Sequence, residues 1–471
     1  MSVRRRVSRE IAAAAGGAIL IAALVALLVT APPAAAAPGD RLWVRTYPAG
    51  PYVEEFRDLV AGPKHSVYAV GVAQGTEETG KLLVARYGDD GARLWTRTYG
   101  AGGDGATGYR AVAVPGGVIV TGTAGNVSCP HKGDILVARY SATGRRLWTV
   151  RYDGTGHRND SPACVATGLY SVTGKLITVY VGGTSVGRGT GSDYVVLQVH
   201  ASSGRVIWTR RYDGPGTADE MRAVHADADG NVYVTGVSAD SGDSTAAATL
   251  GYDLGGRRLW LRRLHADGNP TSGVGITIGM DDADAAAVYV AGTTVGGAPT
   301  AGKEVMLAQL DIRSGAERWT RTAGVPDADD TARAFADDPV YGYAIAGGTV
   351  DSATHAQNGF VATWDQFGTF TWQKTFTMGL PTDQAAFGCV AYGRVGATCG
   401  GSSAAHGTGE DFTVVGFGVD GDLSWTDVYD GAAHGGDVCR DVLVRGTGIF
   451  AAGSVSKGGA NTSGLLIKYA R

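Results

Sequence analysis

The sequence has little charge of either sign and no excess of basic residues. Lysine and arginine number 41 against 45 aspartates and glutamates, which gives a formal net charge of −4. Because nucleic-acid binding usually leaves a basic footprint, this balance argues against nucleic acid as a partner. Charged residues make up only 18% of the chain and hydrophobic residues 44%, so disorder over the whole length is excluded as well.

Helical periodicity and long apolar runs are missing from residues 37–471. No stretch there repeats apolar residues every 3.6 positions, which excludes a helical bundle. The one long run without charge is Ile11–Thr30, which follows the basic residues Arg4–Arg6 and Arg9 and precedes the small residues Ala34–Ala36. This order predicts a signal peptide over residues 1–36 and a secreted, extracellular protein. The alternative is an uncleaved anchor that holds the protein at the outer face of the cytoplasmic membrane.

What is abundant is glycine, 74 of 471 residues, and part of it recurs with tryptophan at a fixed interval. Eight of the nine tryptophans lie 52 to 60 residues apart, and each has a glycine four positions before it. These eight are Trp43, Trp95, Trp148, Trp208, Trp260, Trp319, Trp372 and Trp425. A period near 50 residues is typical of propellers and solenoids.

Each period contains four short β-like segments, called A to D in chain order, separated by Gly, Asp, Asn and Ser clusters. Four strands in each of eight units predict an all-β, eight-bladed β-propeller that fills residues 37–471 as a single domain. The last unit stops after its strand C, whereas Arg41–Tyr47 at the other end reads as an isolated strand D. We therefore expect this first strand to pair with the last blade and close the ring.

Two segments carry a family resemblance. Ala138–Trp148 and Asp311–Trp319 resemble the tryptophan-docking motif of quinoprotein-like (PQQ-like) eight-bladed propellers, and Asp219–Gly236 resembles the repeats of secreted bacterial β-propellers. The resemblance implies that the eight periodic tryptophans lock adjacent blades together. It also implies that a catalytic member would use an adjacent-cysteine disulfide and calcium-binding carboxylates. No two cysteines are adjacent in this chain, so we expect no quinone and no other cofactor.

Polar residues recur at the start of strand A. Three pairs share one spacing, namely Asp219 with Arg222, Asp330 with Arg333, and Asp437 with Arg440, and Glu54 with Arg57 follows it. Repetition favours a structural role, such as binding of turn amides or pairing between blades. Ligand contact is the second interpretation, because strand A of a propeller lines the central channel. The histidines occur singly, without metal-ligand spacing, and predict no metal site.

A basic residue stands two positions after most of the periodic tryptophans. The set is Arg45, Arg97, Arg210, Arg262, Arg321 and Lys374. We expect these side chains to protect an exposed edge strand from pairing with other molecules, the alternative being a cationic binding stripe.

The five cysteines suggest two disulfides. Cys129 in a long loop and Cys164 at the next strand A form the first candidate pair, and Cys389 and Cys399, which flank one hairpin turn, form the second. Cys439 is then expected to be a buried free thiol.

The long, variable D–A and B–C loops emerge on one side of the ring, and variable loops on a rigid scaffold usually carry binding. We therefore expect a monomeric, non-catalytic binding or scaffold module for an unknown protein or carbohydrate ligand outside the cell. The alternatives are an extracytoplasmic enzyme, either quinone-dependent or hydrolytic, and an envelope-assembly protein.

Overall fold

The computed structural model describes residues 36–47, 52–75, 80–100, 105–125, 133–171, 173–240, 244–296, 302–377, 384–404, 409–446 and 448–471. Contacts between Cα atoms divide the chain into Met1–Ala36 and the compact unit Ala37–Arg471. The expected signal segment, apart from Ala36, lies outside the described residues. Among the residues described, no helix has the length and apolar character to cross a membrane.

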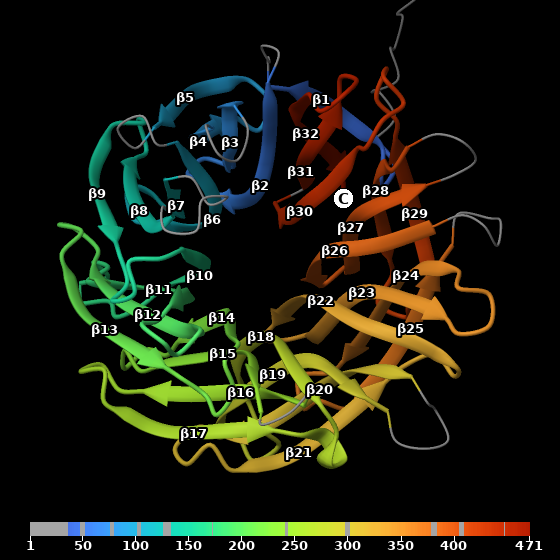
Figure 1. Cartoon of the computed structure of the whole chain (residues 1–471). Coiled ribbons are helices and arrows are strands. Elements are labelled where there is room, and N and C mark those ends of the chain that lie inside the picture. The colour runs from blue at the N-terminus through green and yellow to red at the C-terminus, as the bar shows by residue number, and fades with distance from the viewer. Residues whose placement is uncertain are drawn as a thin grey trace, which may run out of the picture. The chain divides into compact units, whose positions relative to one another are not determined.

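The unit Ala37–Arg471 is an eight-bladed β-propeller, as predicted (Figure 1). Each blade is a four-stranded antiparallel sheet, with strand A innermost and strand D outermost. The A strands of blades 1 to 8 are β2(Val53–Ala61), β6(Ala106–Val114), β10(Asp160–Thr167), β14(Asp219–Ala226), β18(Thr271–Met280), β22(Ala328–Asp338), β26(Gln384–Gly393) and β30(Val438–Arg445). The B strands are β3(Val67–Gly75), β7(Gly117–Ala124), β11(Thr178–Val186), β15(Val232–Ala239), β19(Ala286–Val295), β23(Gly342–Asp351), β27(Gly396–Ala404) and β31(Gly448–Ser456).

The outer half of each blade consists of its strands C and D. The C strands are β4(Lys81–Tyr87), β8(Asp134–Ser141), β12(Ser192–His200), β16(Thr245–Tyr252), β20(Lys303–Asp311), β24(Gln357–Trp364), β28(Asp411–Phe417) and β32(Thr462–Ala470). The D strands of blades 1 to 7 are β5(Arg93–Tyr99), β9(Arg146–Tyr152), β13(Val206–Tyr212), β17(Arg258–Leu264), β21(Glu317–Ala323), β25(Phe370–Phe376) and β29(Leu423–Tyr429), and that of blade 8 is β1(Arg41–Thr46). Within the described residues, one short 3-10 helix, η1(Ala266–Gly268), follows β17.

The ring closes through β1, which pairs antiparallel with β32 of the last blade, from Arg41 opposite Tyr469 to Thr46 opposite Leu465. The predicted closure is therefore confirmed. Arg41 also forms an ion pair with Asp427 of β29, with 2.7 Å between Nη2 and Oδ1, so the first strand is bound to blade 7 as well.

The hydrophobic core is divided into clusters that lie between neighbouring blades. Tyr289 of β19 and Leu307 of β20, for example, pack with Tyr343 of β23 and Phe360 of β24 in the cluster between blades 5 and 6. Every residue of the middle strand β7 is buried. Because each sheet covers both of its neighbours, the hydrophobic effect holds the blades in a ring rather than in one central core.

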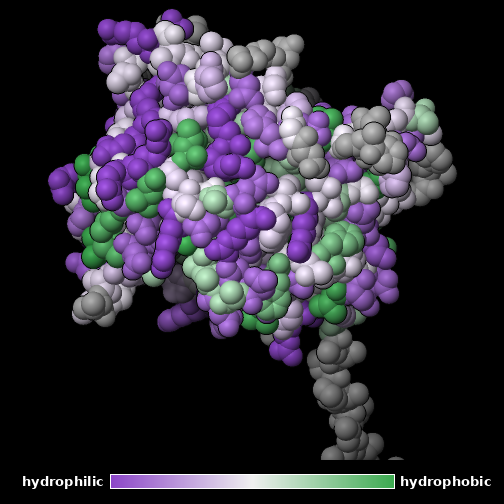
Figure 2. All heavy atoms as spheres, turned by 90° about the horizontal axis from the view of Figure 1, so that it is seen from below, coloured by the Kyte–Doolittle hydropathy of each residue, from purple (hydrophilic) through white to green (hydrophobic). Residues whose placement is uncertain are grey.

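Among the described residues, 17 large hydrophobic side chains are exposed. Several belong to the residue before a docking tryptophan in strand D, including Leu42, Leu94, Leu147, Ile207 and Leu259. On the face that Figure 2 shows, hydrophobic residues form small patches separated by hydrophilic ones. This face offers no large apolar surface of the kind that marks a stable protein interface.

Candidate functional site

All eight inner strands carry a β-bulge at the same place. The pairing of each strand A with strand B shifts by one residue there, for example between Phe56 and Asp58 in β2 and between Cys439 and Asp441 in β30. The extra residues are Arg57, Tyr109, Ala163, Arg222, Val274, Arg333, Gly388 and Arg440. A bulge re-aims the side chain of its extra residue. The bulges therefore set the direction in which the arginine side chains of the recurring pairs point.

Four arginines line a cavity of about 570 Å³ at the inner strands. Arg57, Arg333 and Arg440 come from bulges, and Arg110 follows the bulge of β6. Blade 7 has Gly388 at the equivalent position, and a Cβ atom built there would meet nothing within 4 Å. The absence of a side chain at this bulge is therefore what leaves room between the arginines of blades 6 and 8.

The cavity is polar and unevenly neutralised. Its acidic lining residues are Glu55 and Glu410. Glu55 is buried and accepts hydrogen bonds from two arginines, at 2.9 Å from Nε of Arg57 and 2.6 Å from Nε of Arg440. Arg333 is exposed, and its guanidinium makes no hydrogen bond or ion pair with any residue that the structure describes. One full positive charge is thus available to a ligand in a protein whose net charge is negative.

Two aspartates next to the bulges connect neighbouring blades. Asp441 of blade 8 accepts the backbone N–H of Leu59 at 2.7 Å, and Asp58 of blade 1 accepts that of Ala111 in blade 2 at 2.6 Å. Burial raises the pKa of Asp441 to about 6, although the Leu59 N–H and the guanidinium of Arg110 act in the opposite direction. Burial and the nearby charge of Asp441 likewise raise the pKa of Asp58.

A raised pKa in the folded state makes this joint dependent on pH. The folded protein binds the proton of Asp441 more tightly than the unfolded chain does, so its contribution to stability is present below the unfolded pKa and is lost as pH rises through about 6. Asp441→Asn resembles the protonated acid and should remove this dependence. When the pH is raised from 4 to 7, the free energy of unfolding of the variant should increase by about 1–3 kcal/mol relative to that of the wild type.

Urea unfolding at a series of pH values measures this difference. Asp420→Asn, in the exposed turn between β28 and β29, is the control and should follow the wild type at every pH. Parallel pH profiles for Asp441→Asn and the wild type would contradict the assignment.

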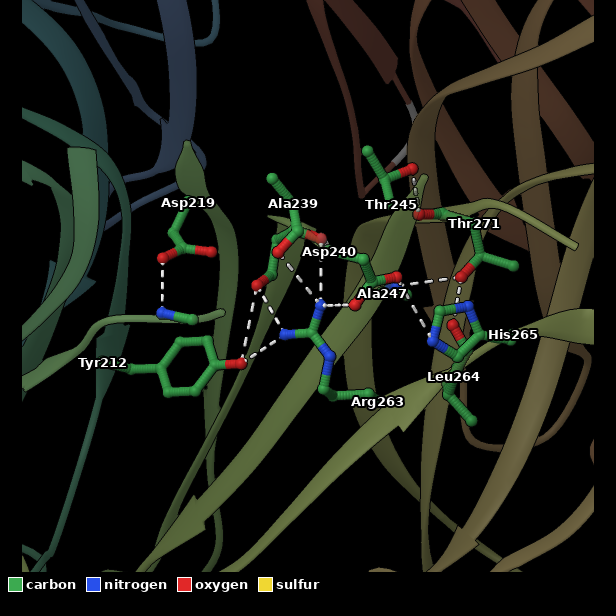
Figure 3. A network of polar contacts seen from close by, with 12 residues as sticks. Tyr212, Asp219, Ala239, Asp240, Thr245, Ala247, Arg263, Leu264, His265 and Thr271 are labelled. Carbon is green, nitrogen blue, oxygen red and sulfur yellow. Dashed lines mark hydrogen bonds and ion pairs between the residues drawn. The ribbon is translucent and has the colours of Figure 1, made fainter. Parts of the chain in front are cut away.

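The aspartates of the recurring pairs lie apart from the arginines that accompany them. Asp219, Asp330 and Asp437 are fully buried and each accepts a backbone N–H from the preceding D–A loop, at 2.6 Å from Gly214, 2.6 Å from Val325 and 2.5 Å from Gly431. Figure 3 shows this contact for Asp219. These carboxylates hold the loop and none lines the cavity.

The structure brings only some of the predicted site residues together. Arg333 and Arg440 share the cavity, whereas Arg222 is absent from its lining and lies 3.2 Å from Glu220 in an ion pair. Two relevant residues were missed. Asp160 accepts the Gly154 N–H at 2.5 Å, as the other three aspartates accept theirs. It was not predicted because no arginine follows it three positions later. Arg110 was not predicted either, because it stands one position after the bulge rather than in it.

The periodic tryptophans and glycines meet across blades. Each glycine that precedes a tryptophan by four positions packs on the tryptophan of the previous blade, as Gly91 does on Trp43 and Gly39 does on Trp425. The eight glycines have positive φ, and a Cβ built at Gly39 would lie 2.7 Å from the indole of Trp425. Glycine is needed there for both reasons. Six of the indoles also donate a hydrogen bond to a carbonyl of the next blade, those of Trp43, Trp95, Trp148, Trp208, Trp260 and Trp372.

The basic residues after the tryptophans contact the next blade. Arg45, Arg97, Arg210 and Arg321 each donate to the carbonyl of the docking glycine in the next blade. Their guanidinium groups lie over the indole two positions earlier, at 4.4 to 6.0 Å from the ring centre. These four side chains therefore connect neighbouring blades. Strand D is still the outermost strand of its sheet, so protection of its edge stays a prediction.

The cysteines correct one expectation. Cys389 and Cys399 are free thiols, so the predicted bridge between them is wrong. In the β26–β27 register Val390 is opposite Cys399 and Cys389 is opposite Gly400, which places the two sulfur atoms on opposite faces of the sheet. Cys389 instead packs with Cys439 in the cluster between blades 7 and 8. Cys439 is buried, whereas Cys129, the expected partner of Cys164, lies outside the described residues.

Comparison with known proteins supports the fold. No family model and no curated protein matches the sequence. The chain is similar to the solved structure of a europium-containing methanol dehydrogenase, with 12% identity, a TM-score of 0.53 and coverage of 91% of this chain and 93% of that one. It is also similar to the Dos1 propeller (8% identity, TM-score 0.48, 92% and 95% covered) and to a quinohemoprotein alcohol dehydrogenase from Comamonas testosteroni (9%, 0.36, 92% and 76%). Similarity at 12% identity, with a TM-score above 0.5, extends to the propeller fold and stops there.

Proposed function

We propose that this protein is an exported, non-catalytic propeller that binds an anionic group of a protein or carbohydrate ligand in the arginine-lined cavity. The observation that carries the proposal is the convergence of Arg57, Arg110, Arg333 and Arg440 on one cavity of about 570 Å³, with Arg333 left without a described partner. The bulges of Arg57 and Arg333 lie at the middle of their A strands, and that of Arg440 lies nearer the N-terminal end, which the D–A loop joins.

Arginine is suited to this task. Its planar guanidinium matches the two oxygens of a carboxylate, sulfate or phosphate and stays charged at every physiological pH. Glu55 holds Arg57 and Arg440 in place through both of its oxygens, so these side chains lose little freedom when a ligand arrives. The pre-oriented pair and the open Arg333 together favour a ligand that carries more than one anionic group.

The cavity does not fit the quinone-dependent alternative. The resemblance to quinoproteins implies an adjacent-cysteine disulfide and calcium-binding carboxylates around the quinone. Within the described residues, the carboxylate groups close enough to share a metal lie at blade joints, and none includes a cavity-lining residue. Binding of an anionic ligand requires only the positive charges of the arginines that line the cavity.

Arginine removal and cavity filling test the proposal. The probes are an oligogalacturonate and a glutamate-rich peptide, titrated calorimetrically at low salt. Arg333→Ala should weaken the binding of at least one probe about tenfold, because a charge-assisted hydrogen bond contributes about 1.5–3 kcal/mol. Gly388→Gln, which fills the gap without adding charge, should weaken it as well.

Gly255→Gln is the matched control. Gly255 lies in the exposed turn between β16 and β17, where a Cβ would meet only Asp253 at 3.4 Å. This variant should bind both probes like the wild type. Equal affinities for the wild type and Arg333→Ala, or no binding of either probe at low salt, would refute the proposed site.

A further inference from the structure

In the part of the chain that the structure describes, three joints between blades gather three aspartates each. In every case one aspartate stands at the start of strand C, one directly follows strand D, and one stands at the start of strand A of the next blade. The groups are Asp134, Asp153 and Asp160 between blades 2 and 3, Asp193, Asp213 and Asp219 between blades 3 and 4, and Asp411, Asp430 and Asp437 between blades 7 and 8. Within each group, one oxygen of every carboxylate lies within 4.8 Å of the others.

At the joint between blades 3 and 4, two aspartates each bury one carboxylate oxygen that accepts no hydrogen bond from a described residue. Asp193 is 2% exposed and Asp219 is 0% exposed, yet the Oδ1 atom of each is buried without a hydrogen-bond partner among the described residues. The Oδ2 atom of Asp193 accepts hydrogen bonds from Thr190 and Arg211. The Oδ2 atom of Asp219 accepts one from the Gly214 N–H. Burying an unpartnered anionic oxygen is costly, and the usual solutions are a cation or a proton.

The backbone fixes the geometry of this group before any ion arrives. Ser192 and Ala218, the neighbours of Asp193 and Asp219, form a parallel β-bridge between the two blades. Three carboxylates face one guanidinium, that of Arg211, so the group retains an excess of two negative charges when ionised. A divalent cation would relieve this repulsion.

At each of the other two joints a histidine ring stands beside one of the carboxylates, although Oδ1 of Asp160 is also buried without a hydrogen-bond partner among the described residues. Asp153 lies 2.7 Å from Nδ1 of His157, and Asp430 lies 2.5 Å from Nδ1 of His434. Both oxygens of Asp437 accept backbone N–H groups. Between blades 4 and 5, Thr271 stands where Asp219 would be, and Asp240 is neutralised by Arg263 (Figure 3). Asp213 has Thr217 four positions on, where Asp153 and Asp430 have their histidines.

We propose that Asp193, Asp213 and Asp219 form a calcium site at the joint between blades 3 and 4. Calcium takes six to eight oxygen ligands at about 2.3–2.6 Å, so two oxygens on opposite sides of the ion are separated by about 4.6–5.2 Å. Each of the three carboxylates offers an oxygen within 4.8 Å of the others, so one ion of this size can contact all three. Magnesium requires a tighter octahedron. Asp213 is exposed, so water and the ion can reach the group from solvent.

Calcium titration of the purified protein, freed of metal by chelation, tests the site directly. Isothermal calorimetry should find a saturable site with a dissociation constant no weaker than about 10⁻³ M, the range of extracellular calcium modules. Terbium should bind in its place with luminescence excited through Tyr212, which precedes Asp213 in the chain. Asp213→Asn should weaken calcium binding at least tenfold, and because Asp213 is exposed the variant should fold normally.

Asp430→Asn is the matched control, since it removes the equivalent carboxylate at the joint where the His434 ring lies 2.5 Å from that carboxylate. It should leave the calcium affinity unchanged. No saturable calcium binding, or equal affinities for Asp213→Asn and the wild type, would overturn the proposal. Magnesium binding as tight as calcium binding would overturn the identity of the ion. The result is independent of anion binding in the arginine-lined cavity, because the two sites share no residue.

Discussion

Deleting Arg41–Tyr47 should remove most of the folding stability of the protein. The deletion takes the whole of β1 away from blade 8 and exposes the edge of β32. It also removes Trp43, which packs edge-on against Phe450 with ring centres 5.9 Å apart and lies under Gly91 of blade 1. Loss of a packed tryptophan costs about 3–5 kcal/mol, and each lost backbone hydrogen bond about 1 kcal/mol. The sum approaches the 5–15 kcal/mol of a typical domain.

Thermal unfolding followed by far-UV circular dichroism measures the effect. If the truncated chain is insoluble, Trp43→Ala provides the graded version of the test and should still lower the melting temperature clearly. A synthetic peptide of residues 37–47, added to the truncated protein, should restore part of the lost stability by filling the vacant edge. A truncated chain that melts at the wild-type temperature would show that the ring does not depend on β1.

Trp260→Ala should destabilise the protein by about 3–5 kcal/mol. Trp260 is 7% exposed, stacks on Tyr233 with ring centres 5.8 Å apart and donates its indole N–H to the carbonyl of Ile312 at 3.0 Å. It also supports Gly315, the docking glycine of blade 5. The substitution therefore opens a cavity between blades 4 and 5 and leaves a carbonyl of the next blade without its donor.

Leu259→Ala is the control on the same strand. Leu259 is 39% exposed on the opposite face, so its truncation should change stability by no more than about 0.5 kcal/mol. Gly315→Ala approaches the same contact from the other side, because Gly315 has φ +68° and its Cβ would lie 2.5 Å from the indole. Chemical denaturation of the three variants should rank Leu259→Ala as the mildest. Equal effects of Trp260→Ala and Leu259→Ala would contradict the docking role.

The number of blades and the closure of the ring followed from the sequence alone. The interval between tryptophans can be read from the sequence because every blade packs on its neighbours in the same way, so the same residues recur at the same positions. The isolated strand D before the first complete unit had only one vacant place to fill, next to β32. Local signals of this kind survive in a single sequence because they depend on strand length, alternation and turn residues.

Contacts between blades were decided only by the tertiary structure. Gly91 stands four positions before Trp95 in the chain but packs on Trp43 of the previous blade, and no spacing rule distinguishes these two partners. The bulge that turns Arg333 into the cavity is a shift in register between β22 and β23, which depends on backbone pairing rather than on residue type.

The arginine-lined cavity and the aspartate group at Asp193 share this origin. The cavity exists because Gly388 interrupts a ring of side chains contributed by different blades. The three aspartates come from a strand C, the end of a strand D and the following strand A, so 26 positions separate the first from the last. The sequence determined the architecture because repeats encode local geometry. The tertiary structure decided the sites, since charges from separate elements become neighbours only when the ring closes.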